Sequence, residues 1–267
     1  MPYGVIHYNT PADDFEEFIK WASETGFECC EVMLRDVWPD ESEYQEDGAH
    51  KAKEILDEHG MFASALQAGN DFVQLDDEAV QEQAERMEKV ARLAKILGTD
   101  VLRTEGGRPK DEVPMHRWSE AMAKCLKACV PFCEDMGVKL AVDNHGVVSN
   151  NPVVILEALH AVDHELIGSN LDTMNLRWWG NPVSELPTIY RALAPFVHHV
   201  HMKDGFNARP DYQGQDLGNG EIPLKECVDI LVEAGYNGPW IAEWEGQGDK
   251  GEGYANCLKW LKANCPG

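Results

Sequence analysis

Short apolar runs alternate with longer amphipathic segments along the whole chain. The short runs have the length of buried strands, whereas the longer segments place apolar residues three and four positions apart, as on one helix face. Phe15, Phe18 and Ile19, for example, share one face of such a segment. Gly26 follows the segment and is a typical helix stop. The pattern therefore predicts a regular alternation of strands and helices.

This alternation comprises eight predicted strands and eight predicted helices. The strands are expected at Gly4–Tyr8, Glu28–Leu34, Met61–Leu66, Val101–Thr104, Val138–Val142, Ile167–Leu171, His198–Lys203 and Pro239–Trp244. The helices are expected at Asp13–Thr25, Glu43–His59, Asp76–Leu97, Pro114–Met136, Pro152–Val162, Pro182–Leu193, Ile222–Ala234 and Tyr254–Ala263.

Strict alternation of this kind predicts a parallel sheet, because consecutive parallel strands need a crossover connection that usually contains a helix. Eight units within 267 residues favour a single α/β domain, a (β/α)₈ TIM barrel that spans residues 1–267. The alternative is an open, doubly wound sheet of the Rossmann type. No glycine-rich phosphate fingerprint opens any predicted helix, so that alternative lacks its main functional support.

The composition, 43% hydrophobic and 26% charged residues, is typical of a soluble globular enzyme. The formal net charge of −24 argues against nucleic acid as a partner, because nucleic-acid binding depends on clustered Lys and Arg. Met1–Tyr8 lacks the pattern of a signal peptide, and no later segment has the apolar length needed to cross a bilayer. We therefore expect a cytoplasmic protein without a membrane partner.

Residues that can bind a metal follow four successive predicted strands at their carboxyl ends. In strand order they are Asp143, Asp172, His201 and Glu243. Side chains alternate between the two faces of a strand, so His145 shares the face of Asp143, and Lys203 shares the face of His201. The active site of a TIM barrel lies at the carboxyl ends of its strands. We therefore expect these side chains to converge there.

Three carboxylates that converge in a buried site repel one another, and burying them unpaired is prohibitive. A divalent cation resolves this conflict. Three oxygen ligands and one imidazole suit Mn²⁺ best, with Mg²⁺, Co²⁺ and Zn²⁺ as alternatives. Each carboxylate taken alone would more often be a solvated loop residue or a helix cap. The occurrence of all four residues at successive strand ends is what favours a metal site.

Several segments, mainly after Val138, carry a resemblance to a known family. They are Leu171-Asp172-Thr173, His201-Met202-Lys203-Asp204, Gly218-Asn219-Gly220-Glu221, Ala234-Gly235-Tyr236-Asn237-Gly238 and Ile241-Ala242-Glu243. In these segments the chain resembles the xylose-isomerase-like barrels, a superfamily that includes tagatose 3-epimerases, hydroxypyruvate isomerases, inosose dehydratases and, more distantly, endonuclease IV. The resemblance implies a TIM barrel that uses a divalent metal on a sugar.

Carried over by position, the resemblance makes the same four strand-end residues the metal ligands. It also suggests Glu31, at the end of the second predicted strand, as a pocket residue. The chain departs from the family pattern at two positions: Asp143 stands where Glu is usual, and Asn175 stands where His is frequent.

The catalytic residues are expected among the ionisable side chains at the strand ends. They are Glu243, Asp143, His145 and Lys203. In the epimerase-type members the carboxylates at the ends of the fifth and eighth strands both ligate the metal and move protons. Asp143 has a shorter side chain than the usual Glu, so its part in proton transfer stays open. An acid/base pair of Glu243 with His145 or Lys203 is the alternative.

Six residues are candidates for substrate contact. They are Glu31, His7, Asn175, Trp178, Trp179 and Arg209. Trp178-Trp179 has the pattern of a platform for stacking a sugar, and the alternative is a hydrophobic cap or a contact between subunits of a homo-oligomer. Arg103 lies near the end of the fourth predicted strand, where gripping a polar ligand competes with the commoner role of a surface charge.

A metal that chelates adjacent oxygens of a keto-sugar or related polyol acidifies the neighbouring C–H by stabilising an enediolate. Returning the proton gives isomerisation or epimerisation, and expelling a β-substituent gives elimination. We expect an isomerase or epimerase, with a dehydratase or lyase acting on a keto-sugar or cyclic keto-polyol as the alternative. An endonuclease IV-like phosphodiesterase would need a basic groove, and a non-catalytic sugar-binding barrel would need no base.

We expect a neutral sugar as the substrate, because few cations follow the sixth predicted strand before the last two helices. They are Arg177, Arg191, Lys203 and Arg209. A chain with 47 acidic residues also slows the approach of a dianion. A phosphorylated substrate would instead point to Arg177 or Arg209 as its clamp.

Overall fold

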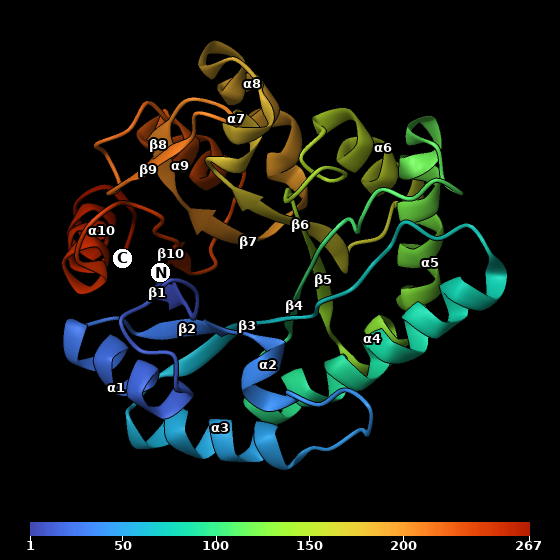
Figure 1. Cartoon of the computed structure of the whole chain (residues 1–267), viewed down its shortest axis with the longest axis horizontal. Coiled ribbons are helices and arrows are strands. Elements are labelled where there is room, and N and C mark those ends of the chain that lie inside the picture. The colour runs from blue at the N-terminus through green and yellow to red at the C-terminus, as the bar shows by residue number, and fades with distance from the viewer.

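Eight parallel strands close into a barrel in the computed structural model, which describes residues 1–267 (Figure 1). The strands are β1 (Tyr3–Ile6), β2 (Cys29–Val32), β3 (Phe62–Gln67), β4 (Val101–Thr104), β5 (Lys139–Asp143), β6 (Ile167–Asp172), β7 (Val197–Met202) and β10 (Trp240–Ala242). They pair in the order β1-β10-β7-β6-β5-β4-β3-β2, and β1 closes the barrel by pairing with both β2 and β10. The predicted (β/α)₈ TIM barrel is confirmed.

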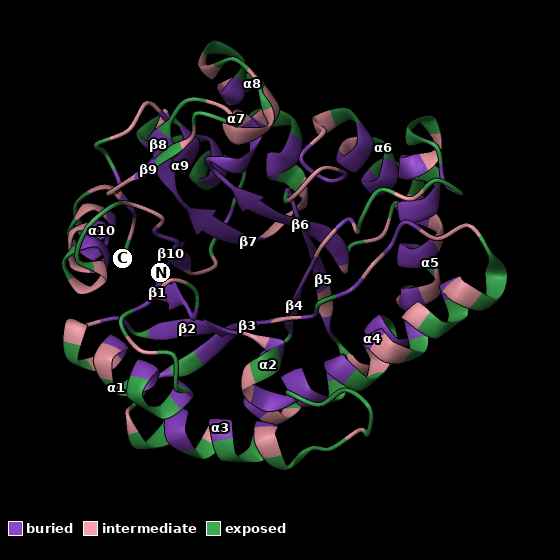
Figure 2. Ribbon diagram, in the orientation of Figure 1, coloured by how far each residue is buried: buried purple, intermediate pink, exposed green.

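Helices surround the barrel, with buried faces toward the strands and exposed faces outward (Figure 2). The longer helices are α1 (Phe15–Thr25), α3 (Asp47–Glu58), α4 (Asp77–Leu97), α5 (Trp118–Met136), α6 (Pro152–Val162), α8 (Leu186–Leu193), α9 (Leu224–Glu233) and α10 (Lys250–Asn264). The shorter ones are α2 (Leu34–Val37), α7 (Asn175–Trp179) and the 3₁₀ turns η1 (Met115–Arg117), η2 (Val183–Glu185) and η3 (Ala194–Phe196). None of the helices combines the length and apolar character that a transmembrane segment requires.

Local sequence signals explain where the helices begin and end. The side chain of Asp14 accepts hydrogen bonds from the backbone N–H groups of Glu16 and Glu17 at the start of α1. Gly26 ends α1 in the left-handed conformation, with φ of 99°. The buried side chains of α1 include Phe18 and Ile19, as their helical spacing predicted.

A hairpin and two short helices are additional to the predicted alternation. A hairpin of β8 (Asp204–Phe206) and β9 (Gln213–Gln215) follows β7, and the short helices α2 and α7 follow β2 and β6. The segments that form them are too short for a periodic signal. The strand expected at Glu28–Leu34 ends at Val32, and the helix expected at Glu43–His59 begins at Asp47.

The barrel interior contains charged and polar side chains near the carboxyl ends of the strands. Glu31 on β2, Arg103 on β4, Asp143 on β5, and His199 and His201 on β7 are each at most 4% exposed. Buried polar groups are costly unless they have partners. This concentration of them marks the part of the fold where a functional site is built.

Candidate active site

Asp172, His201 and Glu243 come together at the carboxyl end of the barrel. Asp172 and His201 are direct partners in the pairing of β6 with β7. Glu243 follows β10, and its backbone N–H donates to the carbonyl oxygen of Met202 at 3.0 Å. One ligand atom from each of the three side chains lies within 4.8 Å of the others, and all three residues are buried. We call these three residues the ligand group, because their side chains are of the types that bind divalent cations.

Two ligand atoms of this group are buried without a hydrogen-bond partner. Asp172 Oδ1 accepts the backbone N–H groups of Met174 and Asn175 at 2.8 and 2.7 Å, whereas Asp172 Oδ2 accepts none. His201 Nδ1 lies 2.9 Å from Glu243 Oε2, but without the alignment of a hydrogen bond. Buried polar atoms without partners are rare in folded proteins. Both atoms therefore fit the role of ligands to a cation.

The charges around the ligand group favour the same interpretation. Burial raises the pKa of Asp172 to about 8, since the attraction of Lys203 does not outweigh the cost of burying the charged form. Burial also opposes the ionisation of Glu243, but Lys203 and His201 outweigh it and hold the pKa of Glu243 well below its usual range. Asp172 therefore ionises at neutral pH only when further positive charge is nearby.

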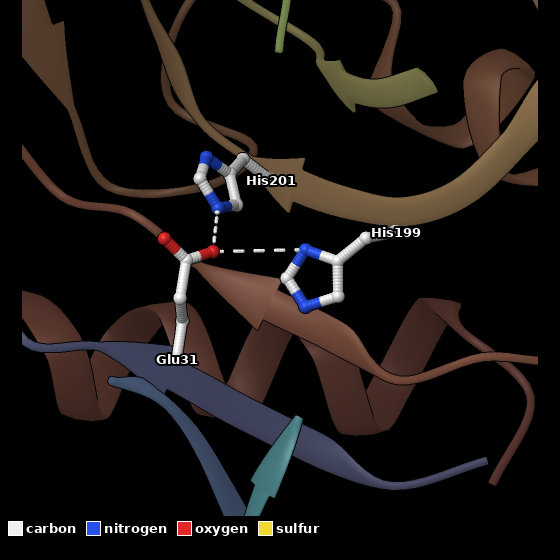
Figure 3. Close-up of side chains that lie close together, drawn as sticks. All are labelled: Glu31, His199 and His201. Carbon is white, nitrogen blue, oxygen red and sulfur yellow. Dashed lines mark hydrogen bonds and ion pairs between the residues drawn. The ribbon is translucent and has the colours of Figure 1, made fainter. Parts of the chain in front are cut away.

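Glu31 holds the ring of His201 from behind (Figure 3). Glu31 Oε2 lies 2.6 Å from His201 Nε2, and the other ring nitrogen of His201 points away from Glu31. A carboxylate on one ring nitrogen fixes the orientation of a histidine whose other nitrogen binds a metal. His199 Nδ1 is 3.7 Å from the same oxygen, and its nitrogens also contact Asn170 Oδ1 at 2.9 Å and Ser64 Oγ at 3.2 Å. Glu31 and His199 thus already have partners and support His201 instead of forming a separate metal site.

Arg103 joins two buried carboxylates inside the barrel. Its Nε donates to Glu31 Oε1 at 2.9 Å, and its Nη1 donates to Asp143 Oδ2 at 3.2 Å. Burial opposes the ionisation of Glu31, but Arg103 and His201 together outweigh it and lower the pKa of Glu31 to about 2. Asp143 Oδ1 accepts a hydrogen bond from Asn170 Nδ2 at 2.8 Å. The structure therefore places Asp143, an expected metal ligand, outside the ligand group and in contact with Arg103.

Two cavities open beside the ligand group. The larger, of about 280 Å³, is lined by Ile6, Tyr8, Met33, Arg35, Arg103, Glu105, Asp143, His145, Glu243 and Glu245. The smaller, of about 150 Å³, is lined by His145, Gly146, Asn175, Trp178, Lys203 and Glu245. A third cavity, of about 460 Å³, lies at the amino-terminal ends of the strands, and no member of the ligand group lines it. Because active sites of TIM barrels lie at the carboxyl ends, the first two cavities form the candidate substrate site.

His7 lies outside both of these cavities. Its ring stacks on Phe18 with centroids 4.1 Å apart, and its nitrogens contact Asp36 Oδ2 at 2.9 Å and the carbonyl oxygen of Ala12 at 3.2 Å. Alternation along β1 places His7 on the side of Val5, which faces the surrounding helices. Packing between β1 and α1 thus takes the place of the substrate contact expected for His7.

The two tryptophans of α7 differ in their position. Trp178 lines the smaller cavity, whereas Trp179 lines neither. The guanidinium of Arg209 lies over both rings, 5.0 Å from the centroid of Trp178 and 4.3 Å from that of Trp179. Asn175, the first residue of α7, contributes a buried Nδ2 without a partner. Of these four expected substrate contacts, Asn175 and Trp178 are the ones that line the candidate site.

The site also contains three residues that were not among the expected metal ligands, catalytic residues or six substrate contacts. Asn170 precedes Asp172 by two positions, so alternation along β6 directs both into the barrel. The same rule pairs His199 with His201 on β7. Arg103 is buried inside the barrel, whereas its charge and its position near a loop favoured the surface. Alternation was the available signal in each case, and the buried partners of these residues were not visible in the sequence.

Comparisons with known proteins agree with this architecture. The family model described as Xylose isomerase-like TIM barrel matches residues 19–264. A xylose isomerase domain protein from Alicyclobacillus acidocaldarius subsp. acidocaldarius has a similar structure, with a TM-score of 0.76 and 17% sequence identity over 98% of this chain and 97% of that chain. No curated protein matches the sequence.

Two further solved structures have the same fold. D-psicose 3-epimerase, solved in the presence of D-fructose, has a TM-score of 0.79 and 15% identity over 100% of both chains. The IOLI protein, solved with a bound zinc atom, has a TM-score of 0.78 and 16% identity over 98% of this chain and 97% of that chain. These identities are low, so the structures show the shared fold, whereas the family model covers most of the sequence. The chain therefore belongs to the xylose isomerase-like TIM barrel family.

Proposed function

We propose that the protein is a divalent-metal-dependent isomerase or epimerase of a keto-sugar or related polyol. The observation that carries the proposal is the pair of buried atoms without a hydrogen bond, Asp172 Oδ2 and His201 Nδ1, the second of which lies 2.9 Å from Glu243 Oε2. These three side chains would hold the cation, for which we propose Mn²⁺ because two carboxylates and one imidazole suit it. A bound divalent cation holds adjacent substrate oxygens and stabilises the negative charge that develops when a neighbouring C–H loses its proton.

The side chains around the cavities divide the remaining tasks. Glu243 lines the larger cavity and is the proposed base. Lys203 Nζ lies 2.9 Å from Glu243 Oε1 and 3.0 Å from Glu245 Oε2, so it orients both carboxylates while it remains charged. His145 lines both cavities and is half exposed, which lets it exchange protons between substrate and solvent. Asn175 offers its free Nδ2 as a donor to a substrate hydroxyl.

The comparisons and the larger cavity support this proposal. The matching family is described as xylose isomerase-like, and one similar structure is a 3-epimerase solved in the presence of the ketose D-fructose. The larger cavity is also lined by two carboxylates from different strands, Asp143 at the end of β5 and Glu243 after β10. Epimerisation requires proton-transfer groups that reach both faces of one substrate carbon, and Glu243 would be the first of them.

Solvent deuterium exchange tests the proposed reaction. The Mn²⁺-loaded protein is incubated in D₂O with a panel of ketoses and aldoses, and carbon-bound deuterium is measured together with product structure. We expect deuterium beside the carbonyl carbon of at least one ketose, and we expect Glu243→Gln to abolish it. Absence of exchange with every sugar, from a protein shown to hold its metal, would contradict the proposal.

Elimination is a second candidate because of the contacts of Asp143. Its oxygens are bound by Arg103 and Asn170, which restrains it from acting as a mobile second base. His145, whose Nδ1 lies 3.7 Å from Asp143 Oδ2, would then protonate a departing hydroxyl. A dehydrated product in the same D₂O experiment would favour this lyase reaction over isomerisation.

A further inference from the structure

Asp143 is held on the inner side of the barrel by two independent contacts. One oxygen accepts from Arg103 Nη1 at 3.2 Å, and the other accepts from Asn170 Nδ2 at 2.8 Å. Asp143 and Asn170 are direct partners in the pairing of β5 with β6, so the second contact follows from the strand register. The carboxyl group is nearly fully buried, at 2% exposure of the side chain. Both oxygens of Asp143 thus accept a hydrogen bond, whereas Asp172 Oδ2 accepts none.

Arg103 is itself fixed in place. Its Nε donates to Glu31 Oε1 at 2.9 Å, and Glu31 Oε2 in turn holds His201 Nε2 at 2.6 Å. The planar guanidinium directs separate N–H groups at the two carboxylates, so it cannot follow Asp143 without loosening its contact with Glu31. A single buried cation thus links the residue behind His201 to Asp143.

From this geometry we infer that Arg103 is a positioning residue that keeps Asp143 away from the cation. The inference rests on the proposed function, because it presumes that the ligand group binds a metal. The cation would then be bound by three protein side chains, Asp172, His201 and Glu243. The position that Asp143 would fill as a fourth ligand would stay open to substrate or water. Asp143 faces the larger cavity as a hydrogen-bond acceptor.

The inference also specifies the class of ligand that this cavity accepts. Four carboxylates line it, Glu105, Asp143, Glu243 and Glu245. Ionised carboxylates only accept hydrogen bonds, so they favour the hydroxyl donors of an uncharged polyol and repel a substrate carboxylate or phosphate. Two cations also line the cavity, Arg35 and Arg103. Arg103 Nε and Nη1 donate to Glu31 and Asp143, and Arg35 Nη2 donates to the carbonyl oxygen of His7, so the four carboxylates outnumber cations that already have partners.

The affinity for Mn²⁺ tests the inference without measuring catalysis. Competition with a fluorescent chelator gives the dissociation constant for the wild type, Asp143→Asn, Asp172→Asn and Arg103→Met. We expect Asp143→Asn to change the affinity less than about threefold, and Asp172→Asn to weaken it at least about a hundredfold, more than the loss of a residue behind a ligand usually costs. In the Arg103→Met background Asp143 is released, so adding Asp143→Asn should then weaken binding about tenfold, as coupled neighbours do.

A second measurement reports the coordination sphere directly. The relaxation of water protons by bound Mn²⁺ depends on how many water molecules it carries. We expect Arg103→Met to lower that number by about one as Asp143 becomes a ligand, and Asp143→Asn in the wild type to leave it unchanged. If Arg103→Met does not fold, Arg103→Lys replaces it, because lysine keeps the charge but not the fork of two donors.

The outcomes separate this inference from the proposed function. Loss of Mn²⁺ binding in Asp143→Asn to the same degree as in Asp172→Asn would overturn the inference and leave the metal site standing. A wild type that binds no Mn²⁺, or an Asp172→Asn variant that binds it normally, would overturn the proposed metal site and this inference with it. An unchanged water number in a folded Arg103→Met variant would also count against Arg103 as the restraint on Asp143.

Discussion

Asp172 is the residue whose ionisation decides whether the ligand group can accept a cation. Burial raises its pKa from 3.8 to about 8, so the folded, metal-free protein holds a proton there at neutral pH that the unfolded chain has lost. The contribution of Asp172 to stability is therefore fully present below about pH 4 and is lost as the pH rises through about 8. A cation reverses this balance, because it binds the ionised form.

Metal affinity should therefore depend on pH. Between pH 6 and pH 8 a cation must displace the proton of Asp172, so the affinity for Mn²⁺ should rise by about tenfold per pH unit near pH 6 and by less as the pH approaches 8. Competition with a chelator of known pH dependence measures the affinity. Calorimetry in buffers of different ionisation enthalpy counts the protons released. An affinity that stays constant from pH 6 to pH 8 would contradict the protonation of Asp172 in the metal-free protein.

Removing Glu31 should destabilise the fold itself. Glu31→Ala leaves the buried guanidinium of Arg103 and the ring of His201 without their shared partner, which should cost about 3–5 kcal/mol of unfolding free energy. Urea denaturation measures the loss. Glu41→Ala is the matched control, because Glu41 pairs with Arg86 at the surface and its removal should cost about 0–1 kcal/mol. Equal losses in the two variants would show that the buried network adds no special stability.

Site residues at strand ends could be predicted from the sequence, whereas residues placed by contacts distant in the chain could not. Asp172, His201 and Glu243 end their strands, and the parallel sheet brings strand ends together whatever the details of packing. Arg103 contacts Glu31, which lies 72 positions away in the chain. No local pattern reports such a partner, so the burial of Arg103 and its hold on Asp143 became visible only in the folded barrel.

Among the elements, the segment between β7 and α9 depends on one carboxylate. Asp204 Oδ1 accepts the backbone N–H groups of Gly205 and Ile222, and Oδ2 accepts those of Gly218 and Gly220. This close approach explains the glycine-containing segment after β9. A Cβ atom on Gly220 would lie 2.1 Å from Asp204 Oδ1, where no atom fits.

Gly220→Ala should therefore loosen this segment. The added methyl group must displace Asp204 or the backbone around it, which should cost about 1–3 kcal/mol, as overpacking does. Thermal unfolding and the rate of proteolysis within residues 205–222 measure the effect. Gly251→Ala is the control: Gly251 lies in the first turn of α10, and its nearest neighbour would be Asp249 Oδ1 at 3.3 Å, so a change of no more than about 1 kcal/mol is expected. Wild-type stability of Gly220→Ala would refute the role given to Asp204.

The same anchored segment explains why some elements were harder to predict than others. Barrel strands and the helices that cover them can be predicted from their periodic apolar residues. The hairpin of β8 and β9 has three-residue strands, and its shape depends on Asp204, so the sequence around it carries no periodic signal. The position of the hairpin follows from the hydrogen bond between Gly220 and Asp204, two residues that are distant in the sequence.

For the molecule as a whole, charge restricts the substrate. The net charge is −24, and the cations near the site already have partners: Arg177 Nε donates to Glu221 at 2.7 Å, Arg209 lies on two tryptophans, and Lys203 contacts two carboxylates. Arg35, which lines the larger cavity, donates to the carbonyl oxygen of His7 at 2.7 Å. Long-range repulsion and the engagement of these local cations act in the same direction.

A neutral sugar should therefore be the better substrate. We expect kcat/KM for a free ketose to exceed that for its phosphorylated form, and the difference should shrink at high ionic strength because salt screens the repulsion. The measurement compares matched pairs of sugars at low and high salt. A strong preference for the phosphorylated sugar at both salt concentrations would refute this expectation and direct attention to Arg177 and Arg209.

Metal analysis of the purified protein is the most direct test of whether Asp172, His201 and Glu243 bind one divalent cation. The protein is treated with a chelator, reloaded with Mn²⁺, desalted and analysed for bound metal, with circular dichroism to verify folding. The wild type and His145→Ala, a cavity variant outside the ligand group, should retain about one Mn²⁺ per chain. Asp172→Ala and His201→Ala should retain almost none. Full occupancy in either of these two variants would show that the substituted residue is not a ligand of the cation.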